Sequence, residues 1–330
     1  MTNATIYDVA AKAGVSISTV SLALNAPRRV KPATLNRVLA AMDELRFVPK
    51  SDAVTRARRG VGRIGVIAPF STYPSFARRL NGVFQATREQ SCEVVVYDQE
   101  SAATATLGSI PLTRRLDGLI VMSVPFGDEI ADRLIEQQVP TVLVELERIG
   151  FSTVTIDDVA GGRMAAELLL AKGHTRFAFL GEEQHQAHPH VLQSSARLAG
   201  FREGLRVRGV ELSDAHIRRV DHTVDAARAA AAELIELTDR PTAIFAHDDV
   251  LAAAVVQVAR GHGLAIPEEL AIVGFDDSEI AEHLGLTSVR QPLEESGEVA
   301  TETLLAEMSN PGRTLQHISL KLSVVERDTT

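Results

Sequence analysis

A chain of 330 residues, of which 45 % are hydrophobic, is long enough for two or three folded units with substantial cores. Its one cysteine, Cys92, excludes an internal disulfide framework, and no apolar stretch approaches the roughly 18 residues of a membrane span. A net charge of −9 argues at first against a protein that binds nucleic acid. Because the start of the chain lacks the basic and apolar runs of a secretory signal, we expect a cytoplasmic protein with no membrane partner.

The charge is distributed unevenly along the chain. Residues 1–63 contain eleven Lys and Arg against four Asp and Glu, a net charge of +7, which leaves −16 for residues 64–330. A basic end on an acidic body is typical of a protein that touches a polyphosphate with one end only. A basic, solvated tail is the competing interpretation, and it is disfavoured because the same segment has an ordered helical pattern.

Three short helical patterns predict a helix-turn-helix unit in residues 1–48. Apolar residues recur at helical spacing in residues 6–13, and Gly14 ends this first helix. A second helix follows Ser16, whose side chain can cap it, and a third begins at Pro32, since proline is favoured in a first helical turn. Three helices in about 45 residues with a tight turn between the first two are typical of a DNA-binding helix-turn-helix.

The second of these helices is rich in short hydrogen-bonding side chains: Ser16, Ser18, Thr19, Ser21 and Asn25. Hydroxyl residues are mediocre helix formers, so this many in one short helix indicates contacts with phosphates and base edges. Ile17 and Ser18 lie at its N-terminal end, from which side chains reach the major groove, and Leu22 lies about one turn further on. A purely structural helix rich in hydroxyl groups is the alternative.

The head also carries a run of spaced motifs: Tyr7-Asp8-Val9-Ala10, Ala13-Gly14-Val15-Ser16, Thr19-Val20-Ser21, Leu24-Asn25 and Phe47-Val48-Pro49. Together they resemble the headpiece of the lactose/galactose-repressor family of bacterial transcription regulators. The resemblance implies a cytoplasmic repressor, associated with the nucleoid when it is bound, whose homodimer reads a near-palindromic operator in double-stranded DNA. It assigns DNA contacts to the following residues: Thr5, Tyr7, Ser16, Ile17, Ser18, Thr19, Ser21, Leu22, Asn25, Lys31, Thr34, Ala53 and Arg56.

Two residues of the head depart from the family pattern. The family usually has arginine at the position of Leu22, and arginine bonded to guanine is the commonest specific base contact. Leucine offers only apolar contact, for example to a thymine methyl group, so we expect an operator half-site that differs from the usual family sequence. Lys31 replaces a frequent serine, and we expect it to contact a phosphate by charge.

Residues 49–63 are expected to form the hinge between head and body. In the family this segment folds into a short helix on the operator, and a leucine of that helix wedges into the minor groove and kinks the duplex. Arg56 occupies the leucine position here; arginine enters a narrow minor groove but is a poor apolar wedge, so we expect smaller bending. The pattern Gly60-x-Gly62-x-x-Gly65 resembles a dinucleotide-binding fingerprint, but it precedes a strand, so we interpret these glycines as linker flexibility.

Short β-branched runs alternate with helical patterns in residues 64–330, which predicts parallel sheets with right-handed crossovers. The predicted strands are Ile64–Ala68, Glu93–Tyr97, Gly118–Met122, Thr141–Val144, Phe177–Leu180, Thr242–Ala246 and Leu270–Gly274. The pattern restarts near Thr175, which predicts two similar lobes, the second covering roughly residues 162–290. Ligands of such folds bind outside the carboxyl ends of the strands.

The body shares further landmarks with the same family, among them Ala171-Lys172-Gly173-His174, Val273-Gly274-Phe275-Asp276-Asp277 and Arg290-Gln291-Pro292. The resemblance implies an α/β fold: an all-α helix-turn-helix headpiece (1–48) joined by a hinge (49–63) to a two-lobed, parallel-sheet domain like the periplasmic sugar-binding proteins (64–330). It also implies allosteric control by a small carbohydrate-like effector, with contacts at Arg197, Asp248 and Asp276 and with Asp157 nearby. We expect Phe70, Tyr73 and Phe76, just after the first strand, to stack on the apolar face of a sugar ring. Carboxylates and guanidinium groups bind vicinal hydroxyls and aromatic rings stack on sugars, whereas structural ion pairs and core packing are the alternatives.

Other interpretations have less support in the sequence. No Gly-x-Ser-x-Gly, His-Glu-x-x-His or Gly-Lys-Ser/Thr motif is present, so we expect neither an enzyme nor a cofactor. The spacing of His185, His188 and His190 matches no standard zinc site, so we expect no metal there and interpret them as a polar loop. Two alternatives remain: a solute-binding protein for transport, and a cytoplasmic sugar-binding or sugar-modifying protein with a DNA-binding-like head.

Overall fold

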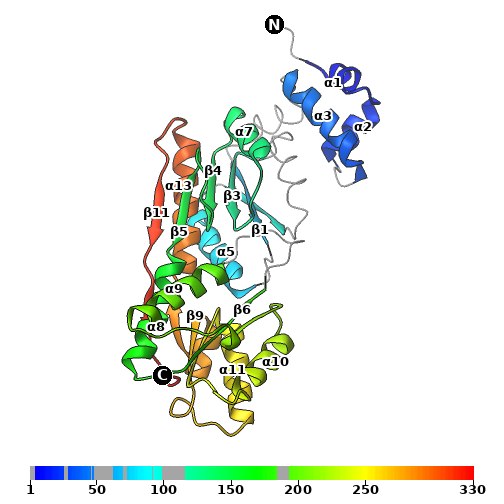
Figure 1. Cartoon of the computed structure of the whole chain (residues 1–330). Coiled ribbons are helices and arrows are strands. Elements are labelled where there is room, and N and C mark those ends of the chain that lie inside the picture. Colours follow the sequence, from blue (N-terminus) through cyan, green and yellow to red (C-terminus); the bar gives the residue numbers. More distant parts are fainter. Residues whose placement is uncertain are drawn as a thin grey trace. The chain divides into compact units, whose positions relative to one another are not determined.

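The computed structural model describes residues 4–25, 29–45, 47, 62–69, 73–90, 92–98, 116–183 and 193–330, with only the backbone of Asn25, Asp43 and Asp98 (Figure 1). Contacts divide the chain into two compact units. The first comprises Met1–Ser71, Asn81–Thr153 and Gly297–His317, and the second comprises Thr72–Leu80, Val154–Ser296 and Ile318–Thr330. Each unit is therefore assembled from segments that are far apart in the sequence.

Three helices form the described part of the headpiece: α1 (Ile6–Ala13), α2 (Ile17–Asn25) and α3 (Pro32–Glu44). Thr5 and Asp8 form a capping box ahead of α1, and Gly14 ends this helix with a φ of 63°, a left-handed conformation that favours glycine. The hydroxyl of Ser16 accepts a hydrogen bond from the backbone N–H of Thr19 (3.1 Å) and caps α2. The helices bury a common apolar core that includes Val9, Val20, Val38 and Met42, so the three predicted helices are confirmed.

One six-stranded sheet has the order β11-β5-β4-β3-β1-β2. Most of it lies in the first unit, whereas residues 154–156 and 318–320 at one side of the sheet are counted with the second. The strands of this sheet are β1 (Gly62–Ala68), β2 (Cys92–Asp98), β3 (Gly118–Met122), β4 (Thr141–Val144), β5 (Ser152–Ile156) and β11 (His317–Leu320). The pairs β1/β2, β1/β3 and β3/β4 are parallel. The helices that accompany these strands are α5 (Pro74–Thr87), α7 (Asp128–Glu136) and α13 (Leu293–Ser309). The buried strands β3 and β4 read as continuous apolar runs because a parallel sheet has both faces covered.

The glycine pattern at the start of the body is structural. Gly62 and Gly65 lie inside β1, so the interpretation of these two glycines as linker flexibility is wrong. A Cβ at the buried Gly65 would lie 2.4 Å from a methyl carbon of Leu116, so glycine leaves room for a core side chain. Gly60 lies outside the described residues.

The second unit contains a six-stranded sheet with the order β12-β10-β9-β8-β6-β7. Its strands are β6 (Phe177–Glu182), β7 (Ile217–Val220), β8 (Ala243–Ala246), β9 (Ala271–Asp276), β10 (Thr287–Arg290) and β12 (Ser323–Val325). All neighbours are parallel except β10 and β12, which are antiparallel. The helices of this unit are α8 (Asp158–Ala171), α9 (Gln193–Val207), α10 (Val224–Ile235), α11 (Asp249–Gly261), α12 (Glu279–Leu284) and a 3-10 turn, η2 (Asp214–His216).

Alternate residues of the second sheet enter two different cores. Phe177 and Phe179 of β6 pack with α8 and α9, whereas Ala178 and Leu180 of the same strand pack with α10 and α11. This alternation follows from the period of two along a strand, and it places one helix pair on each face of the sheet. The carboxyl ends of the strands are left for polar side chains.

The predicted fold class is confirmed: an all-α headpiece precedes an α/β body with two mostly parallel sheets. Each of the seven predicted strands is present, with ends displaced by at most two residues. Five strands were not predicted, β5, β7, β10, β11 and β12, because they are short and several carry polar residues in place of an apolar run. The proposed domain boundaries remain a prediction. Within the described ranges no helix has the length and apolar character required to cross a membrane.

Candidate functional site

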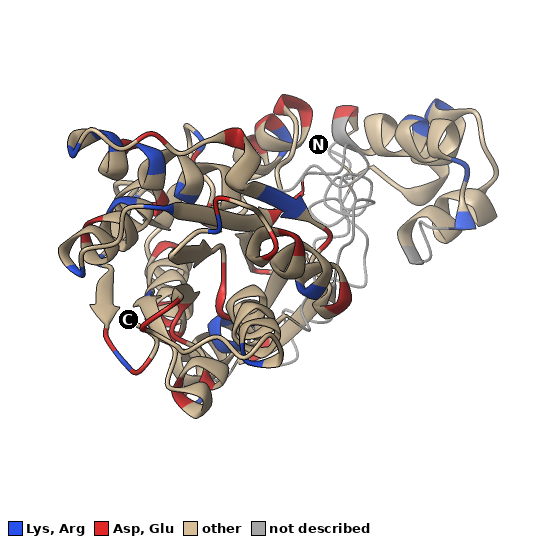
Figure 2. Ribbon diagram, turned by 60° about the horizontal axis from the view of Figure 1, so that its bottom comes forward, with Lys and Arg blue, Asp and Glu red and all other residues tan. Residues whose placement is uncertain are grey.

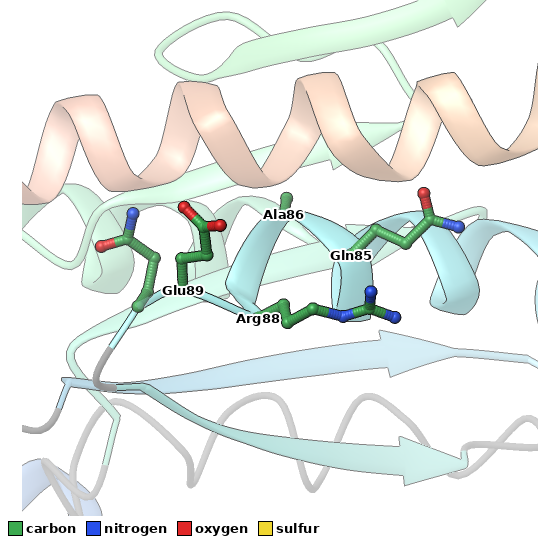
Figure 3. A pocket seen from close by; sticks show the side chains of 5 residues that line it. Gln85, Ala86, Arg88 and Glu89 are labelled. Carbon is green, nitrogen blue, oxygen red and sulfur yellow. The ribbon is translucent and has the colours of Figure 1, made fainter.

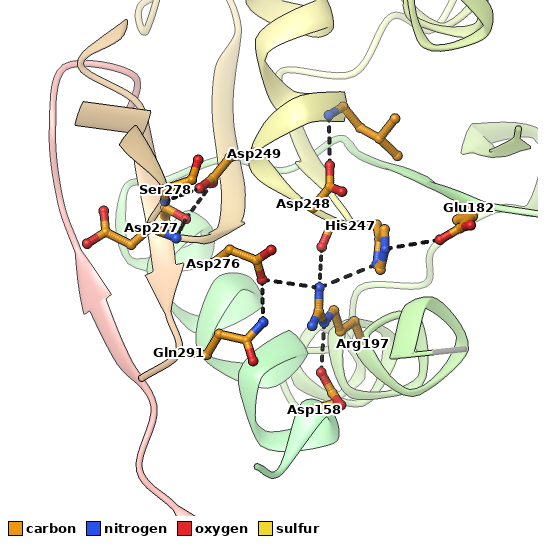
Figure 4. A network of polar contacts seen from close by, with 12 residues as sticks. Asp158, Glu182, Arg197, His247, Asp248, Asp249, Asp276, Asp277, Ser278 and Gln291 are labelled. Atoms are coloured by element: carbon orange, nitrogen blue, oxygen red, sulfur yellow. Dashed lines mark hydrogen bonds and ion pairs between the residues drawn. The ribbon is translucent and has the colours of Figure 1, made fainter. Parts of the chain in front are cut away.

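Polar side chains gather at the carboxyl ends of the strands in the second unit (Figure 4). Glu182 ends β6, Asp276 ends β9, and His222, His247 and Asp248 follow directly after β7 and β8. Because these strands are parallel neighbours, their ends lie along the same edge of the sheet. This edge is where ligands bind in open α/β folds.

Arg197, on α9, lies at the centre of this cluster (Figure 4). Its Nε donates to Oδ1 of Asp158 (2.7 Å), and its Nη1 donates to the carbonyl oxygen of His247 (2.7 Å) and lies 3.9 Å from Oδ1 of Asp276. The guanidinium carbon is 3.6 Å from the centre of the Phe275 ring. Although burial alone would lower the pKa of Arg197, the charges of Asp158 and Asp276 raise it above its ordinary value, so a fixed cation is held there.

The carboxylate next to Arg197 is one residue away from the predicted one. Asp157 is exposed and caps α8, accepting the backbone N–H of Ala160 on Oδ1 (2.8 Å). Asp158, the next residue, forms the ion pair with Arg197. An effector contact by Asp157 remains a prediction, and Asp158 joins the candidate site.

Asp276 begins a strained turn. Asp276 and Asp277 have φ values of 98° and 52°, in the left-handed region that disfavours residues other than glycine. Nε2 of Gln291 donates to Oδ1 of Asp276. Nη1 of Arg78 donates to the carbonyl oxygen of Asp277 (3.0 Å), while Nε and Nη2 of Arg78 hold the carboxylate of Glu294 at 2.6 and 2.8 Å. Gln291 therefore holds the carboxylate of Asp276, and Arg78 holds the backbone of the turn.

His222 and Asp248 form a second, separate ion pair in the cluster. Nε2 of His222 donates to Oδ2 of Asp248, and Oδ1 of Asp248 accepts the backbone N–H of Leu251 (2.8 Å), which caps α11. Burial alone would lower the pKa of His222, but the hydrogen bond and charge of Asp248 raise it to about 9. Burial alone would raise the pKa of Asp248, but His222 lowers it to about 2. The pair is thus charged at neutral pH.

The predicted aromatic contacts differ in their surroundings. Tyr73 stacks on His222, with ring centres 4.6 Å apart, so it belongs to the polar cluster. Phe76 is only 9 % exposed and lies beneath the guanidinium of Arg79, whose carbon is 5.7 Å from the ring centre. Packing therefore accounts for Phe76, and an effector contact there remains a prediction. Phe70 lies outside the described residues.

A separate surface pocket of about 530 Å³ lies at the end of α5 and in the turn after it (Figure 3). Its lining residues are Gln85, Ala86, Arg88, Glu89 and Gln90. The lining is mostly polar, and it contains none of the predicted site residues. Cys92, the first residue of β2, is half-buried, and burial raises the pKa of its thiol, which makes it a poor nucleophile.

The headpiece presents the predicted DNA-contacting residues at its surface. Tyr7 is 67 % exposed, Ile17 is 40 % exposed and Leu22 is 37 % exposed, high values for apolar side chains beside an apolar core. Ser16, Ser18 and Lys31 are exposed as well, whereas Thr19, Ser21 and Thr34 are half-buried. Figure 2 colours the Lys and Arg residues of these helices blue. The side chain of Asn25, the hinge residues Ala53 and Arg56, and the histidines of 185–190 lie outside the described residues.

Five residues of the cluster were missed by the sequence predictions: Asp158, Glu182, His222, His247 and Gln291. Their common signal is position, since Glu182, His222, His247 and Gln291 end or follow a strand of the second sheet. Nε2 of His247 lies 3.6 Å from Oε2 of Glu182, which ties the end of β6 to the end of β8. Two of these strand ends belong to β7 and β10, strands that the apolar pattern did not reveal.

A helix-turn-helix followed by an α/β body with a polar site at its strand ends defines a DNA-binding transcription regulator with a ligand-binding body. Residues 5–50 match the bacterial regulatory proteins of the lacI family, and residues 162–330 match the periplasmic binding protein-like domain. The chain belongs to the lacI family of bacterial regulatory proteins.

The similarity to individual relatives extends over almost the whole chain. The protein is 30 % identical over 338 residues to the HTH-type transcriptional regulator DegA of Bacillus subtilis (strain 168), with 99 % of this chain and 98 % of the relative covered. It is 31 % identical over 332 residues to the HTH-type transcriptional regulator CelR of Thermobifida fusca, with 96 % and 95 % covered. The solved structure of a CelR–cellobiose complex matches with a TM-score of 0.71 at 29 % identity, covering 99 % of this chain and 100 % of that chain.

Proposed function

We propose that this transcription regulator is a cytoplasmic repressor that binds a near-palindromic operator as a homodimer and releases or tightens its hold when a small carbohydrate binds. The effector site is the cluster at the strand ends of the second unit. The protein turns over no substrate: its role is to couple the binding of two ligands, and this coupling is reciprocal.

The observation that carries this proposal is the juxtaposition of Arg197 and Asp276. A buried guanidinium with Nη1 3.9 Å from a carboxylate oxygen offers a donor and an acceptor side by side, the pattern that a vicinal diol satisfies. Both carboxylate oxygens of Asp248 accept hydrogen bonds from the protein itself, one from the backbone N–H of Leu251 and one from His222. We therefore assign the effector-facing role at this position to His222, held in place by Asp248 and by the ring of Tyr73.

The DNA-binding face is proposed to be the exposed end of α2. Ile17, Ser18 and Leu22 supply contacts to base edges, and Lys31 supplies a phosphate contact. Since leucine has no hydrogen-bonding group, the half-site is expected to carry a thymine methyl group opposite Leu22. Arg56 is proposed to enter the minor groove at the centre of the operator without a large kink.

The dimer contact is proposed to include α5 and the edge strand β2. Phe84 of α5 is 47 % exposed and Val96 of β2 is 37 % exposed, and β2 is the last strand of its sheet. Exposed apolar side chains beside an open sheet edge are typical of a surface that another chain covers.

The proposal is tested with full-length protein, fragmented host genomic DNA and a panel of uncharged mono- and disaccharides. We expect recovery of an inverted repeat, and one sugar that changes the affinity for it. An Arg197→Met variant is expected to keep its affinity for the repeat and to lose the response to the sugar. Chemical conversion of any sugar, or an unchanged sugar response in Arg197→Met, would overturn the proposal.

A further inference from the structure

A further carboxyl group, that of Asp249, lies next to the effector cluster and contacts none of the effector residues named above. Asp249 is the first residue of α11 and is 1 % exposed. Its Oδ2 accepts the backbone N–H of Ser278 at 2.6 Å (Figure 4). Its Oδ1 accepts the hydroxyl of Ser288 on β10 at 2.6 Å. A buried carboxyl group whose two oxygens accept hydrogen bonds from two different segments holds those segments in a fixed relation to its own helix.

The segment tied by Asp249 is the strained turn that carries Asp276. Ser278 follows the turn directly, and the hydroxyl of Ser288 accepts the backbone N–H of Asp277 (3.0 Å). Asp276 and Asp277 both have positive φ values, and such residues persist only where the surroundings over-determine them. Asp249 supplies two of the restraints, one through Ser278 and one through Ser288.

The neighbouring strand is shaped to receive this carboxyl group. A Cβ at Gly274 of β9 would lie 2.3 Å from Oδ1 of Asp249, so only glycine lets the carboxyl group approach the strand. Two residues further along β9 is Asp276. The position of Asp249 is therefore fixed by close contact as well as by hydrogen bonds.

The protonation state of Asp249 is also set by this environment. Burial, and secondarily the charge of Asp276, raise its pKa to about 8. Of the charged groups nearby, Asp276 and Asp277 belong to the turn, and Arg290 and Arg327 are paired with the carboxylate of Asp277. The backbone N–H of Ser278 donates to Oδ2 and the hydroxyl of Ser288 donates to Oδ1, and these hydrogen bonds limit the rise of the pKa.

We propose that Asp249 is a positioning residue for the effector site: through its hydrogen bonds to Ser278 and Ser288 it holds the turn that carries Asp276. This inference rests on the proposed role of Asp276 in effector binding. Ionisation of Asp249 places a second buried carboxylate behind Asp276, and the repulsion between them displaces the turn. Effector affinity is then high below the pKa of Asp249 and falls above it.

The test compares wild-type protein, Asp249→Asn and Asp249→Ala by calorimetric titration with the sugar found to bind, from about pH 6 to about pH 8.5. Wild-type affinity is expected to fall about fourfold by half a pH unit above the pKa, since only the neutral form binds. Asparagine keeps an oxygen that accepts from Ser278 and has no titratable group, so Asp249→Asn retains binding and its pH profile is flat. Asp249→Ala binds at least tenfold more weakly, by about the loss expected for one buried hydrogen bond to a charged or strained group.

Two further measurements separate this inference from others. Leu234→Ala removes a buried side chain of α10 that takes no part in the hydrogen bonds of Asp249, so it lowers stability but leaves the pH profile unchanged. Amide hydrogen exchange over residues 276–284 reports on the turn directly, and it is expected to accelerate in Asp249→Ala and in wild-type protein above the pKa. If no sugar binds wild-type protein, the proposed function fails. Amide hydrogen exchange still tests whether Asp249 holds the turn, because it needs no sugar. An Asp249→Asn profile as steep as that of wild-type, or unchanged exchange in Asp249→Ala, overturns the inference.

Discussion

Asp248 and His222 form a buried ion pair in which Nε2 of the imidazolium donates to Oδ2 of the carboxylate. The pKa of His222 is raised to about 9, and the pKa of Asp248 is lowered to about 2. Two charges taken out of water stabilise a fold only when their geometry satisfies both, and the second oxygen of Asp248 is satisfied by the backbone N–H of Leu251. The pair therefore fixes the ring of His222 at the proposed effector site.

The Asp248→Asn substitution tests this pair. We expect the pKa of His222 to fall from about 9 towards its ordinary value near 6.5, because the charge that stabilises the imidazolium is removed. The raised pKa of His222 contributes stability below about pH 6.5 that is lost as the pH rises through 9, and the lowered pKa of Asp248 contributes above about pH 4. The loss in the free energy of unfolding, on the order of 3 kcal/mol, is thus largest between about pH 4 and about pH 6.5. NMR titration of His222 and denaturation at several pH values measure both.

The Arg197→Lys substitution tests the central guanidinium. A lysine cannot reach Asp158, Asp276 and the carbonyl of His247 at the same time, so effector affinity is expected to fall at least about tenfold although the charge is kept. Arg202→Lys, on an exposed arginine of the same helix, is the matched control and is expected to leave affinity unchanged. Equal affinities for the two variants would remove Arg197 from the site.

The Leu22→Arg substitution tests base recognition by α2. The side chain of Leu22 is partly exposed, so arginine is accommodated without loss of the headpiece core. We expect selected sites to acquire a guanine in each half-site, with a preference of about 1–3 kcal/mol over the original base. Lys31→Ala, in contrast, is expected to weaken binding to all sequences alike and to reduce the salt dependence. Selection of the same repeat by Leu22→Arg and wild-type protein would show that this residue does not read bases.

The Gly200→Ala substitution tests the packing of α8 against α9. A Cβ at Gly200 would lie 1.8 Å from the carbonyl oxygen of Val159, so the helices must separate. We expect a loss of more than about 3 kcal/mol in the free energy of unfolding, together with weaker effector binding, because α9 carries Arg197. Gly261→Ala, at the end of α11 where a Cβ meets open space, is the control and is expected to change stability by less than about 1 kcal/mol.

The sequence predicted the fold well because its strongest signals are periodic. Buried strands such as β3 and β8 are apolar throughout, and the head is marked by caps at Thr5, Ser16 and Gly14. Short strands were missed where arginines interrupt the apolar run, as in β7. Such short strands form because neighbouring strands of the sheet pair with them, and a local sequence pattern does not contain this pairing.

The site was predicted less completely than the fold. Arg197, Asp248, Asp276 and Tyr73 do lie in one cluster, but His222 was overlooked because the strand before it was overlooked. Asp157 and Asp158 are adjacent carboxylates, and only the register of the helix cap decides which one turns back to the backbone and which one meets Arg197. A sequence pattern does not specify that register to one residue.

The contact between α8 and α9 has a consequence for how new effector specificities arise in this protein. Gly162 and Gly200 bring the two backbones so close that a Cβ at Gly162 would lie 1.9 Å from the carbonyl oxygen of Arg197 itself. Arg197 therefore lies on a pair of tightly packed helices. Because α9 cannot shift without α8, a shift of α9 alone cannot enlarge the proposed effector site for a bulkier ligand. Variation in ligand shape has to be absorbed by the side chains at the strand ends, above all those that surround His222 and Tyr73.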